Sequence, residues 1–503
     1  MPPHLPQLVP PDSASALAER YDTIAYAAQA HAQTHPAQLA TVATLLGLPS
    51  PPVATCRVLE VGCADGANLL PMAASLPLAQ FTGCDLSAQA IARATRAAAD
   101  LGLANVTLLQ QDLRDLVDAD GTFDYIVAHG VYSWVPAPVR DALLALAARR
   151  LAQNGVMFVS YNTFPGCHIR QAAWEILHAH VDALPTARQR LDEARALCAL
   201  LAQPGATQTE NDAFMRAEFG RLAVQSDSAL YHDDLAVPNQ PFWFHEFAAA
   251  LAPHGLAYLG ETKLSMMTPA GLSPQVAQFV AGMDRLAREQ YLDYARMRRF
   301  RHSLVCRADA PAMSTDLETR LSSMHVAASI TLVRAAAEDK TLLGPTMDAT
   351  PEVRGNRALL QWLVDIAPDI VPVPAATAWQ RQHAPASARS ASAMLVDACY
   401  AGMVNLHVHP PSLASRDSAR PRASAIVRWQ VQRQASVTNL RHETLRIDDP
   451  LARRLLAALD GSRSHDELVA LVADALPVAE RDAAAARVAT YLSHFTLHAL
   501  LSA

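Results

Sequence analysis

A turn of small residues follows an apolar strand candidate in the stretch RVLEVGCADGANLL, residues 57–70. Such a turn between a strand and a helix can bind a phosphate, a dinucleotide or a sulfonium compound. A phosphate-binding loop needs a lysine followed by a hydroxyl residue, and this turn has no lysine. A dinucleotide fingerprint needs the spacing G-x-G-x-x-G, which the turn lacks, and Asp65 would repel a pyrophosphate. A positively charged sulfonium ligand is therefore the class that fits best.

Polar side chains at the ends of the next two strand candidates support this class. Asp85 ends the second candidate, where a carboxylate can accept both hydroxyls of a ribose. Gln111 and Asp112 follow the third, where an amide or a carboxylate can bind the amino group of an adenine. Either carboxylate alone could be an ordinary strand-end cap. Together, and in this order, they favour a nucleoside-binding site that faces a cation.

Strands and helices alternate around these residues, which predicts a parallel sheet with helices on both faces. The carboxyl ends of such strands line one crevice. A helix and a strand in FHEFAAALAPHGLAYLGETKL, and a strand in RRFRHSLVCR, are expected to close one edge of the sheet, with a helical insertion before them. The first five strand candidates are CRVLEVG, QFTGCDL, NVTLLQQD, FDYIVAHG and GVMFVSYN.

These motifs resemble those of class I S-adenosylmethionine-dependent methyltransferases, with Ala64 where the second glycine of the turn is usual. The resemblance implies a doubly wound, Rossmann-like α/β sheet and S-adenosylmethionine as the cofactor. The implied reaction is the displacement of a methyl group from a sulfonium by a neutral amine, for which positioning and exclusion of water supply most of the acceleration.

Aromatic residues follow the fourth and fifth strand candidates, in HGVYSWVP (residues 129–136) and SYNTFPGCHIR (residues 160–170). Ring faces attract cations, and a pocket of low polarity disfavours the ammonium form of an amine. We therefore expect Tyr132, Trp134 and Tyr161 to line the acceptor pocket, with Asn162 orienting the nitrogen. Core packing is the alternative for each ring.

Four segments further resemble the methyltransferase family with a regulatory domain that includes the rickettsial-type outer-membrane protein lysine methyltransferases. They are the two segments just quoted, YDTIAYAAQAHAQTHPAQLATVATLLGL (residues 21–48) and EQYLDYARMRRFRHSLVCR (residues 289–307). Ala25 stands where that family usually has a proline, and Cys167 where a tryptophan is commoner. The resemblance implies methylation of a protein, with lysine as the acceptor and an outer-membrane or surface protein before its export as a candidate substrate.

The cofactor site expected from the motifs and the resemblance includes a lid formed by two tyrosines, for which packing on a surface helix is an equal alternative. His129 is expected there too, as a base or, more in keeping with its place, as a buried imidazole. No metal site is expected, because His407 and His409 lack a third ligand. The expected cofactor-binding residues are Glu60, Gly62, Cys63, Ala64, Gly66, Asn68, Asp85, Leu86, Gln111, Asp112, His129, and, as the lid, Tyr21 and Tyr26.

The chain of 503 residues is long enough for about three domains. Its C-terminal part shows a strand-like HVAASITLV, a helical TPEVRGNRALLQWLVDIA, a linker candidate AWQRQHAPASARSASA and a strand-like SAIVRWQVQ. Two amphipathic helices, DPLARRLLAALDG and SHDELVALVADAL, then suit an α+β winged-helix module. The expected regions are an N-terminal helical cap (1–50), the cofactor-binding core (51–171), the helical insertion (172–235), the closing edge or regulatory domain (236–310), a middle region (311–390) and the winged-helix-like domain (391–503).

Composition limits the expected cellular location of the protein and the kinds of partner it can bind. No secretory leader and no apolar span of membrane length is visible, and the seven scattered cysteines suggest reduced thiols, so we expect the cytoplasm and no stable membrane insertion. A net charge of −7 without a basic block argues against nucleic acid.

Three functions stay open: a protein lysine methyltransferase, a small-molecule methyltransferase with regulatory or dimerising domains, and a non-catalytic cofactor-binding module. A homodimer is a further expectation. Because every expected cofactor residue precedes the C-terminal domain, its removal is expected to leave cofactor binding near normal.

Overall fold

A computed structural model describes residues 23, 24, 26, 28–205, 209–313, 316–337, 351–384, 390–414 and 418–503. Tyr21 and Ala25, two positions singled out in the sequence, lie outside the described residues. Among the residues that are described, no helix has both the length and the apolar composition needed to cross a bilayer.

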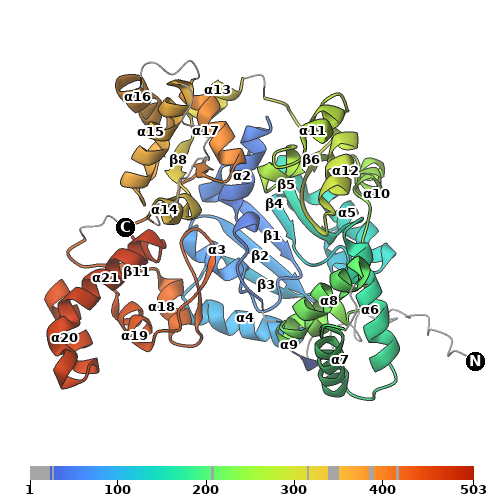
Figure 1. The fold of residues 1–503 in the computed structure, drawn as a ribbon, viewed down its shortest axis with the longest axis horizontal. Helices are drawn as coiled ribbons and strands as arrows, with labels where there is room; N and C mark the ends of the chain where they lie inside the picture. The colour runs from blue at the N-terminus through green and yellow to red at the C-terminus, as the bar shows by residue number, and fades with distance from the viewer. Residues whose placement is uncertain are drawn as a thin grey trace, which may run out of the picture.

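A seven-stranded sheet forms the centre of the fold, with the strand order β3-β2-β1-β4-β5-β7-β6 (Figure 1). Its first five strands are parallel, and β7 runs antiparallel to both β5 and β6. The two late strands therefore close the edge of the sheet, as predicted. The strands are β1 (Arg57–Val61), β2 (Gln80–Asp85), β3 (Val106–Gln110), β4 (Phe123–Ala128), β5 (Leu151–Asn162), β6 (Leu256–Glu261) and β7 (Phe300–Arg307).

Both faces of the sheet are buried, because successive residues of β1 belong to different cores. Val58 packs in a core with helices α2 (Pro36–Leu45) and α3 (Leu69–Ser75), whereas Leu59 packs in a core with α5 (Ala137–Arg150) and α10 (Phe244–Leu251). This alternation is the period of two of a strand covered by helices on each side. Helix α4 (Ala88–Asp100) connects β2 and β3. The predicted doubly wound fold is confirmed.

A group of helices follows β5 and has an apolar core of its own, which includes Leu191, Phe219 and Leu230. Its last part, a π-helical turn (Leu230–Asp234), continues directly from α9. The other helices are α6 (Cys167–Val181), α7 (Ala187–Leu201), α8 (Glu210–Ala223) and α9 (Asp227–Ala229). Two more helices, α11 (Pro274–Ala281) and α12 (Arg285–Arg296), lie between β6 and β7 in the chain.

The buried guanidinium of Arg301 anchors β7 to these neighbouring elements. It donates hydrogen bonds to Glu261 on β6 and to Glu289 and Asp293 on α12. All four side chains are almost fully buried, so each charge depends on its partners. This network fixes the strand that begins with Phe300, which lines the crevice.

After β7 the chain forms a second, three-stranded sheet with helices around it. Its strands are ordered β10-β8-β9 and pair antiparallel. The elements are α13 (Leu317–Ser322), β8 (His325–Ala328), α14 (Ile330–Ala337), α15 (Pro351–Asp365), β9 (Val371–Pro372), α16 (Val373–His383), α17 (Ala391–Tyr400) and β10 (Val404–His407).

The last part of the chain packs around a separate core and lies beside α3 and α4 (Figure 1). Its hairpin of β12 and β13 and its helices are the parts of a winged-helix domain. The elements are β11 (Arg422–Ala423), α18 (Ala425–Val431), β12 (Ser436–Thr438), β13 (Thr444–Arg446), α19 (Pro450–Ala458), α20 (His465–Ala475), α21 (Ala484–Leu497) and β14 (Leu501–Ser502).

One local prediction in this half was wrong, and two were correct only in part. The strand-like SAIVRWQVQ is helix α18, because the Ser424 hydroxyl caps its start and Ile426, Val427, Gln430 and Val431 form one buried face. The strand in HVAASITLV ends at Ala328, where Ser329 caps the next helix by accepting from the Leu332 nitrogen. The linker candidate is helical at both ends, since it contains the end of α16 and the start of α17, while residues 385–389 lie outside the described part of the chain.

Candidate functional site

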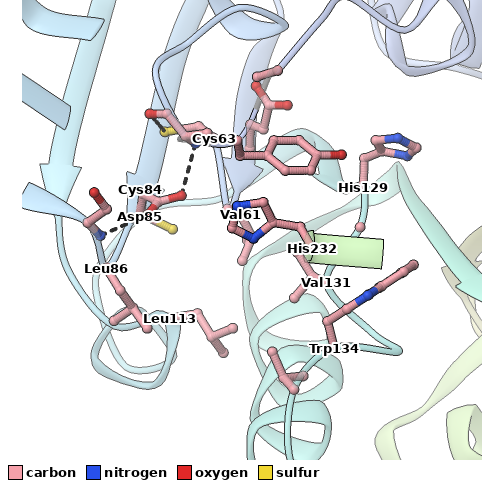
Figure 2. A pocket seen from close by; sticks show the side chains of 18 of the residues that line it. Val61, Cys63, Cys84, Asp85, Leu86, Leu113, His129, Val131, Trp134 and His232 are labelled. Atoms are coloured by element: carbon pink, nitrogen blue, oxygen red, sulfur yellow. Dashed lines mark hydrogen bonds between the residues drawn. The ribbon is translucent and has the colours of Figure 1, made fainter. Parts of the chain in front are cut away.

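A cavity of about 600 Å³ opens beyond the carboxyl ends of the parallel strands. In Figure 2, Asp85, Leu86 and Leu113 lie on one side of it, His129 and Trp134 lie on the other, and His232 lies between them. The N-terminal segment before α2 and the π-helical turn of the insertion complete the lining. Segments far apart in the sequence therefore meet over the crevice of the sheet.

The turn after β1 is fixed by the end of β2. The backbone nitrogens of Gly62 and Cys63 donate to the Cys84 carbonyl, and the Asp85 carboxylate accepts from the nitrogens of Ala64 and Ser87 at 2.9 and 2.8 Å. Gly62 and Ala64 both adopt the left-handed region, with φ of 72° and 47°. Alanine in that region is strained, whereas glycine is not.

Glu60 lies buried at the base of the cavity, with 4% of its surface exposed. One carboxylate oxygen, Oε1, accepts a hydrogen bond of 2.7 Å from the Asn68 side-chain nitrogen. The other, Oε2, has no hydrogen-bond partner among the described residues. Burial, opposed by the Asn68 hydrogen bond, raises the pKa of Glu60 to about 8. A buried oxygen left unpaired in a cavity is a site for a cation or for another hydrogen-bond donor.

The side of the cavity near β2 and β3 can hold a nucleoside. Leu86 and Leu113 supply apolar walls, and Gln111 lies beside them. Asp112 also lines the cavity, but both of its oxygens bind Arg114, and these hydrogen bonds hold the pKa of the Asp112 carboxyl below its usual value. Asp85, the other predicted carboxylate, also lines the cavity and accepts from the backbone nitrogens of Ala64 and Ser87.

The opposite side carries polar atoms with unused hydrogen-bonding capacity. Asn162 donates to Asn239 at 2.7 Å, while its Oδ1 has no partner in the described structure. The same holds for the indole nitrogen of Trp134. Both residues line the cavity, together with Phe300 and the carboxyl of Asp233, whose pKa is raised by burial and by Asp234 to about 6. This half can accept an N–H group and can surround an amine with rings.

Two predicted acceptor residues lie elsewhere, which corrects the expectation for them. Tyr161 is fully buried in the core, stacked on Phe247 at 4.4 Å, and its hydroxyl lies 3.2 Å from the Ser303 hydroxyl. Tyr132 packs edge-on against Phe247 and Phe242 in the same core. Side chains alternate along β5, so Tyr161 points to the face opposite its neighbours and cannot join Asn162 in the cavity.

Gly66 does not line the cavity either, although it was predicted to let the backbone approach the cofactor. A side chain there would lie 2.9 Å from Leu70 and 3.3 Å from Ala94. Gly66 therefore allows α3 and α4 to pack closely. The predicted residues that the structure brings to the cavity are Tyr26, Glu60, Gly62, Cys63, Ala64, Asn68, Asp85, Leu86, Gln111, Asp112, His129, Trp134 and Asn162.

Several lining residues were missed by the sequence analysis. The His31 ring lies 3.9 Å from the His129 ring, tilted by 49°, and burial lowers the pKa of His31 to about 4, so the ring is neutral at pH 7. His232 Nε2 donates to the Ile24 carbonyl at 2.6 Å, and its ring meets Tyr26 edge-on. His31 stands in the segment quoted for the resemblance, residues 21–48. Its spacing from Tyr26 could have indicated that it belongs to the same site. His232 and Asp233 belong to the insertion, where no motif marks them.

Three family models match separate parts of the chain. One described as a methyltransferase domain matches residues 58–155, which begin in β1. One described as a predicted methyltransferase regulatory domain matches residues 226–307, which contain β6 and β7. A third, described as the C-terminal winged helix domain of PKMT, matches residues 419–490.

Two proteins of Rickettsia prowazekii are similar in sequence. RP789 is 36% identical over 291 residues, which are 58% of this chain and 53% of RP789, so the chain spans about half the length of that relative. RP028 is 34% identical over 228 residues, which are 45% of this chain and 91% of RP028.

A solved structure is similar over almost the whole chain. It is PKMT2 from Rickettsia typhi in complex with AdoHcy, which covers 95% of this chain and 99% of that one, with a TM-score of 0.81 and 24% identity. The likeness establishes a shared fold from the sheet to the winged-helix domain.

Proposed function

We propose that this chain, which belongs to a family of class I methyltransferases, is an S-adenosylmethionine-dependent protein lysine methyltransferase. The family combines a methyltransferase domain, a regulatory domain and a PKMT-type winged-helix domain, as the relative RP028 and the three matching models indicate. The observation that carries the proposal is the pair of carboxylates at the base of the cavity. Glu60 has an unpaired oxygen, and Asp85 stands at the end of the neighbouring strand.

These residues fit S-adenosylmethionine. The unpaired oxygen of Glu60 would bind the ammonium of its methionine part, and the Asp85 carboxylate, at the end of β2 in the cavity lining, would bind the ribose hydroxyls. Leu86 and Leu113 would enclose the adenine, with Gln111 at its edge. When bound, the cofactor supplies an electrophilic methyl group attached to a sulfonium.

The acceptor half would position the amine. Asn162 Oδ1 accepts a hydrogen bond from the amine nitrogen, and the rings of Trp134 and Phe300 exclude water and favour the neutral form of the amine. Asp233 gives the incoming ammonium an anionic partner within the lining. Tyr26 and His232, which meet edge-on in the cavity lining, would act as a lid and limit the water that reaches the reacting atoms.

Lysine in a protein is the acceptor that the relatives favour, because the fold is shared with a protein named PKMT2 and the winged-helix model carries the same name. The unused polar atoms of Trp134 and Asn162 argue against a module that only binds the cofactor. A small-molecule acceptor is the alternative, and no particular contact favours it.

The experiment is methyl transfer from isotope-labelled S-adenosylmethionine by the purified protein to a fraction of unfolded bacterial outer-membrane proteins, followed by mass spectrometry of the labelled peptides. Label on lysine side chains is the expected result. Asn162→Ala should lose most of the transfer, whereas Tyr161→Phe, in the adjacent core position, should keep it. Label confined to small molecules would overturn the protein acceptor. Label in neither proteins nor small molecules would overturn the catalytic function.

Three further parts of the proposal concern the location of the reaction, the substrate and the assembly. The reaction would take place in the cytoplasm, since all seven cysteines are free thiols and six of them are buried. An outer-membrane protein before its export is the proposed substrate, from the family resemblance, and a homodimer is the proposed assembly. Sedimentation of the purified protein measures the assembly directly.

A further inference from the structure

The hairpin of the winged-helix domain reaches the base of the cofactor cavity. Residues 439–443 form its tip, between β12 and β13. At this tip, His442 is 97% buried and its Nε2 lies 2.9 Å from Oδ1 of Asn68, in the turn after β1. The two residues are 374 positions apart. A domain at the end of the chain thus contacts a residue that lines the cavity.

Asn68 joins this contact to Glu60. Its side-chain nitrogen donates to Glu60 Oε1 at 2.7 Å, while its Oδ1 also accepts from the His31 backbone nitrogen. Asn68 stands at the start of α3, where an asparagine commonly caps the helix, yet its side chain makes no capping hydrogen bond. The amide is used instead to connect the hairpin, the N-terminal segment and Glu60.

The chemistry of the two ends of an amide makes the connection directional. Oδ1 only accepts and Nδ2 only donates, so His442 must donate its Nε2 hydrogen to Oδ1. That donation holds Nδ2 toward Glu60, whose oxygen accepts. Without it, the amide loses one of the contacts that determine which end faces Glu60.

The hairpin tip is itself held rigidly. Asn439 accepts from the backbone nitrogens of Arg441 and Glu443 and donates to the His498 carbonyl. These contacts hold His442 in the left-handed region, with φ of 60°, which is uncommon for a side chain of this size. Thr444, just after the tip, donates to the Ala30 carbonyl beside the cavity. The tip therefore presents one imidazole to Asn68 from a fixed backbone.

We propose that His442 is a positioning residue through which the winged-helix domain orients Asn68 and, with it, the Glu60 carboxylate that receives the ammonium of the cofactor. Cofactor affinity then depends on the docking of the C-terminal domain, contrary to the expectation that its removal leaves binding near normal. This inference rests on the proposed function, because it assigns the ligand of Glu60.

Calorimetry of S-adenosylhomocysteine binding to the full chain tests the proposal. His442→Ala should raise the dissociation constant about tenfold, the equivalent of one hydrogen bond. His442→Gln, which keeps a side-chain N–H donor, should recover most of the affinity. Arg433→Ala is the matched control, because it removes a contact of the same domain, to Asp100 on α4, without touching Asn68.

A double variant separates this role from a general loss of structure. If His442 acts through Asn68, adding His442→Ala to Asn68→Ala should weaken binding no further than Asn68→Ala alone. Additive losses, an unchanged dissociation constant in His442→Ala, or an equal loss in Arg433→Ala would each overturn the proposal. If the unaltered chain fails to bind the ligand, the proposed function itself fails, and thermal unfolding of each variant shows whether it is folded.

Discussion

The carboxylate of Asp85, at the end of β2, accepts a hydrogen bond of 2.9 Å from the backbone nitrogen of Ala64, in the turn that follows β1 (Figure 2). Its second oxygen accepts from the nitrogen of Ser87, the residue that caps α4. A single side chain thus fixes the loops at the ends of two neighbouring strands. Asp85 and both loops line the same cavity.

Asp85→Ala should weaken the binding of S-adenosylmethionine by about 1.5 to 3 kcal/mol, the range for hydrogen bonds to charged groups. Two losses contribute, since the ribose loses its acceptor and the Ala64 turn loses its anchor. Asp85→Asn keeps an oxygen for the Ala64 nitrogen and should therefore retain part of the affinity. Calorimetry measures both variants, and an unchanged dissociation constant in a folded Asp85→Ala protein would remove Asp85 from the cofactor site.

Ala64→Gly should stabilise the protein. Ala64 has a φ of 47°, and the left-handed region costs an alanine roughly 1 to 2 kcal/mol more than a glycine. Part of this gain is offset by the greater freedom of glycine in the unfolded chain, so the expected increase in the free energy of unfolding is about 1 kcal/mol. Urea denaturation measures it.

Ala67→Gly is the control for that prediction, because Ala67 lies in the same turn without a positive φ. It should lower the free energy of unfolding. If both glycine variants lower it, strain at Ala64 is not what the substitution relieves.

The sequence was sufficient to predict the central sheet, because its strands are short apolar runs between recognisable helices. It was also sufficient for Glu60 and Asp85, since parallel strands bring their carboxyl ends to one edge whatever the details of packing. The unusual Ala64 was visible as a departure, and the structure adds the left-handed backbone that makes it costly.

The sequence was not sufficient where the orientation of a side chain, or a contact between distant segments, decides which residues form the site. Tyr161 and Asn162 are neighbours on β5, and only the alternation of the strand, read in the correct register, separates the core residue from the cavity residue. His232 lines the cavity and His442 contacts the lining residue Asn68, both from distant parts of the chain, and no local pattern marks either of them. The helix α18 was mistaken for a strand because its β-branched and aromatic residues have strand propensity that buried packing overrides.

Tyr161→Phe and Asn162→Ala should behave differently, although the residues are adjacent. Tyr161→Phe removes a hydroxyl that contacts Ser303 inside the core, so it should lower the free energy of unfolding by about 1 kcal/mol and leave kcat unchanged. Asn162→Ala removes the proposed acceptor of the amine N–H and should lower kcat about tenfold or more with little change in cofactor affinity. Steady-state kinetics with a labelled cofactor measures both. A drop in kcat for Tyr161→Phe as large as for Asn162→Ala would return Tyr161 to the acceptor site.

Cofactor binding should depend on pH through Glu60. Burial raises the pKa of this carboxyl to about 8, so in the free protein it is mostly protonated at pH 7. A bound ammonium favours the ionised carboxylate, and binding must therefore release a proton below that pKa. The affinity should rise with pH, by at most about tenfold per pH unit, and level off above about pH 8.

Calorimetry at several pH values, in buffers of different ionisation enthalpy, measures the affinity and the proton release together. Asp233, with a pKa of about 6, titrates in the same range, whereas His31, with a pKa of about 4, is already neutral there. Glu60→Gln separates these groups, because it keeps an acceptor for Asn68 but cannot ionise. That variant should bind more weakly at pH 8 and lose the pH dependence between 7 and 8. If the dependence persists in Glu60→Gln, another group carries it, and Glu60 does not receive the ammonium.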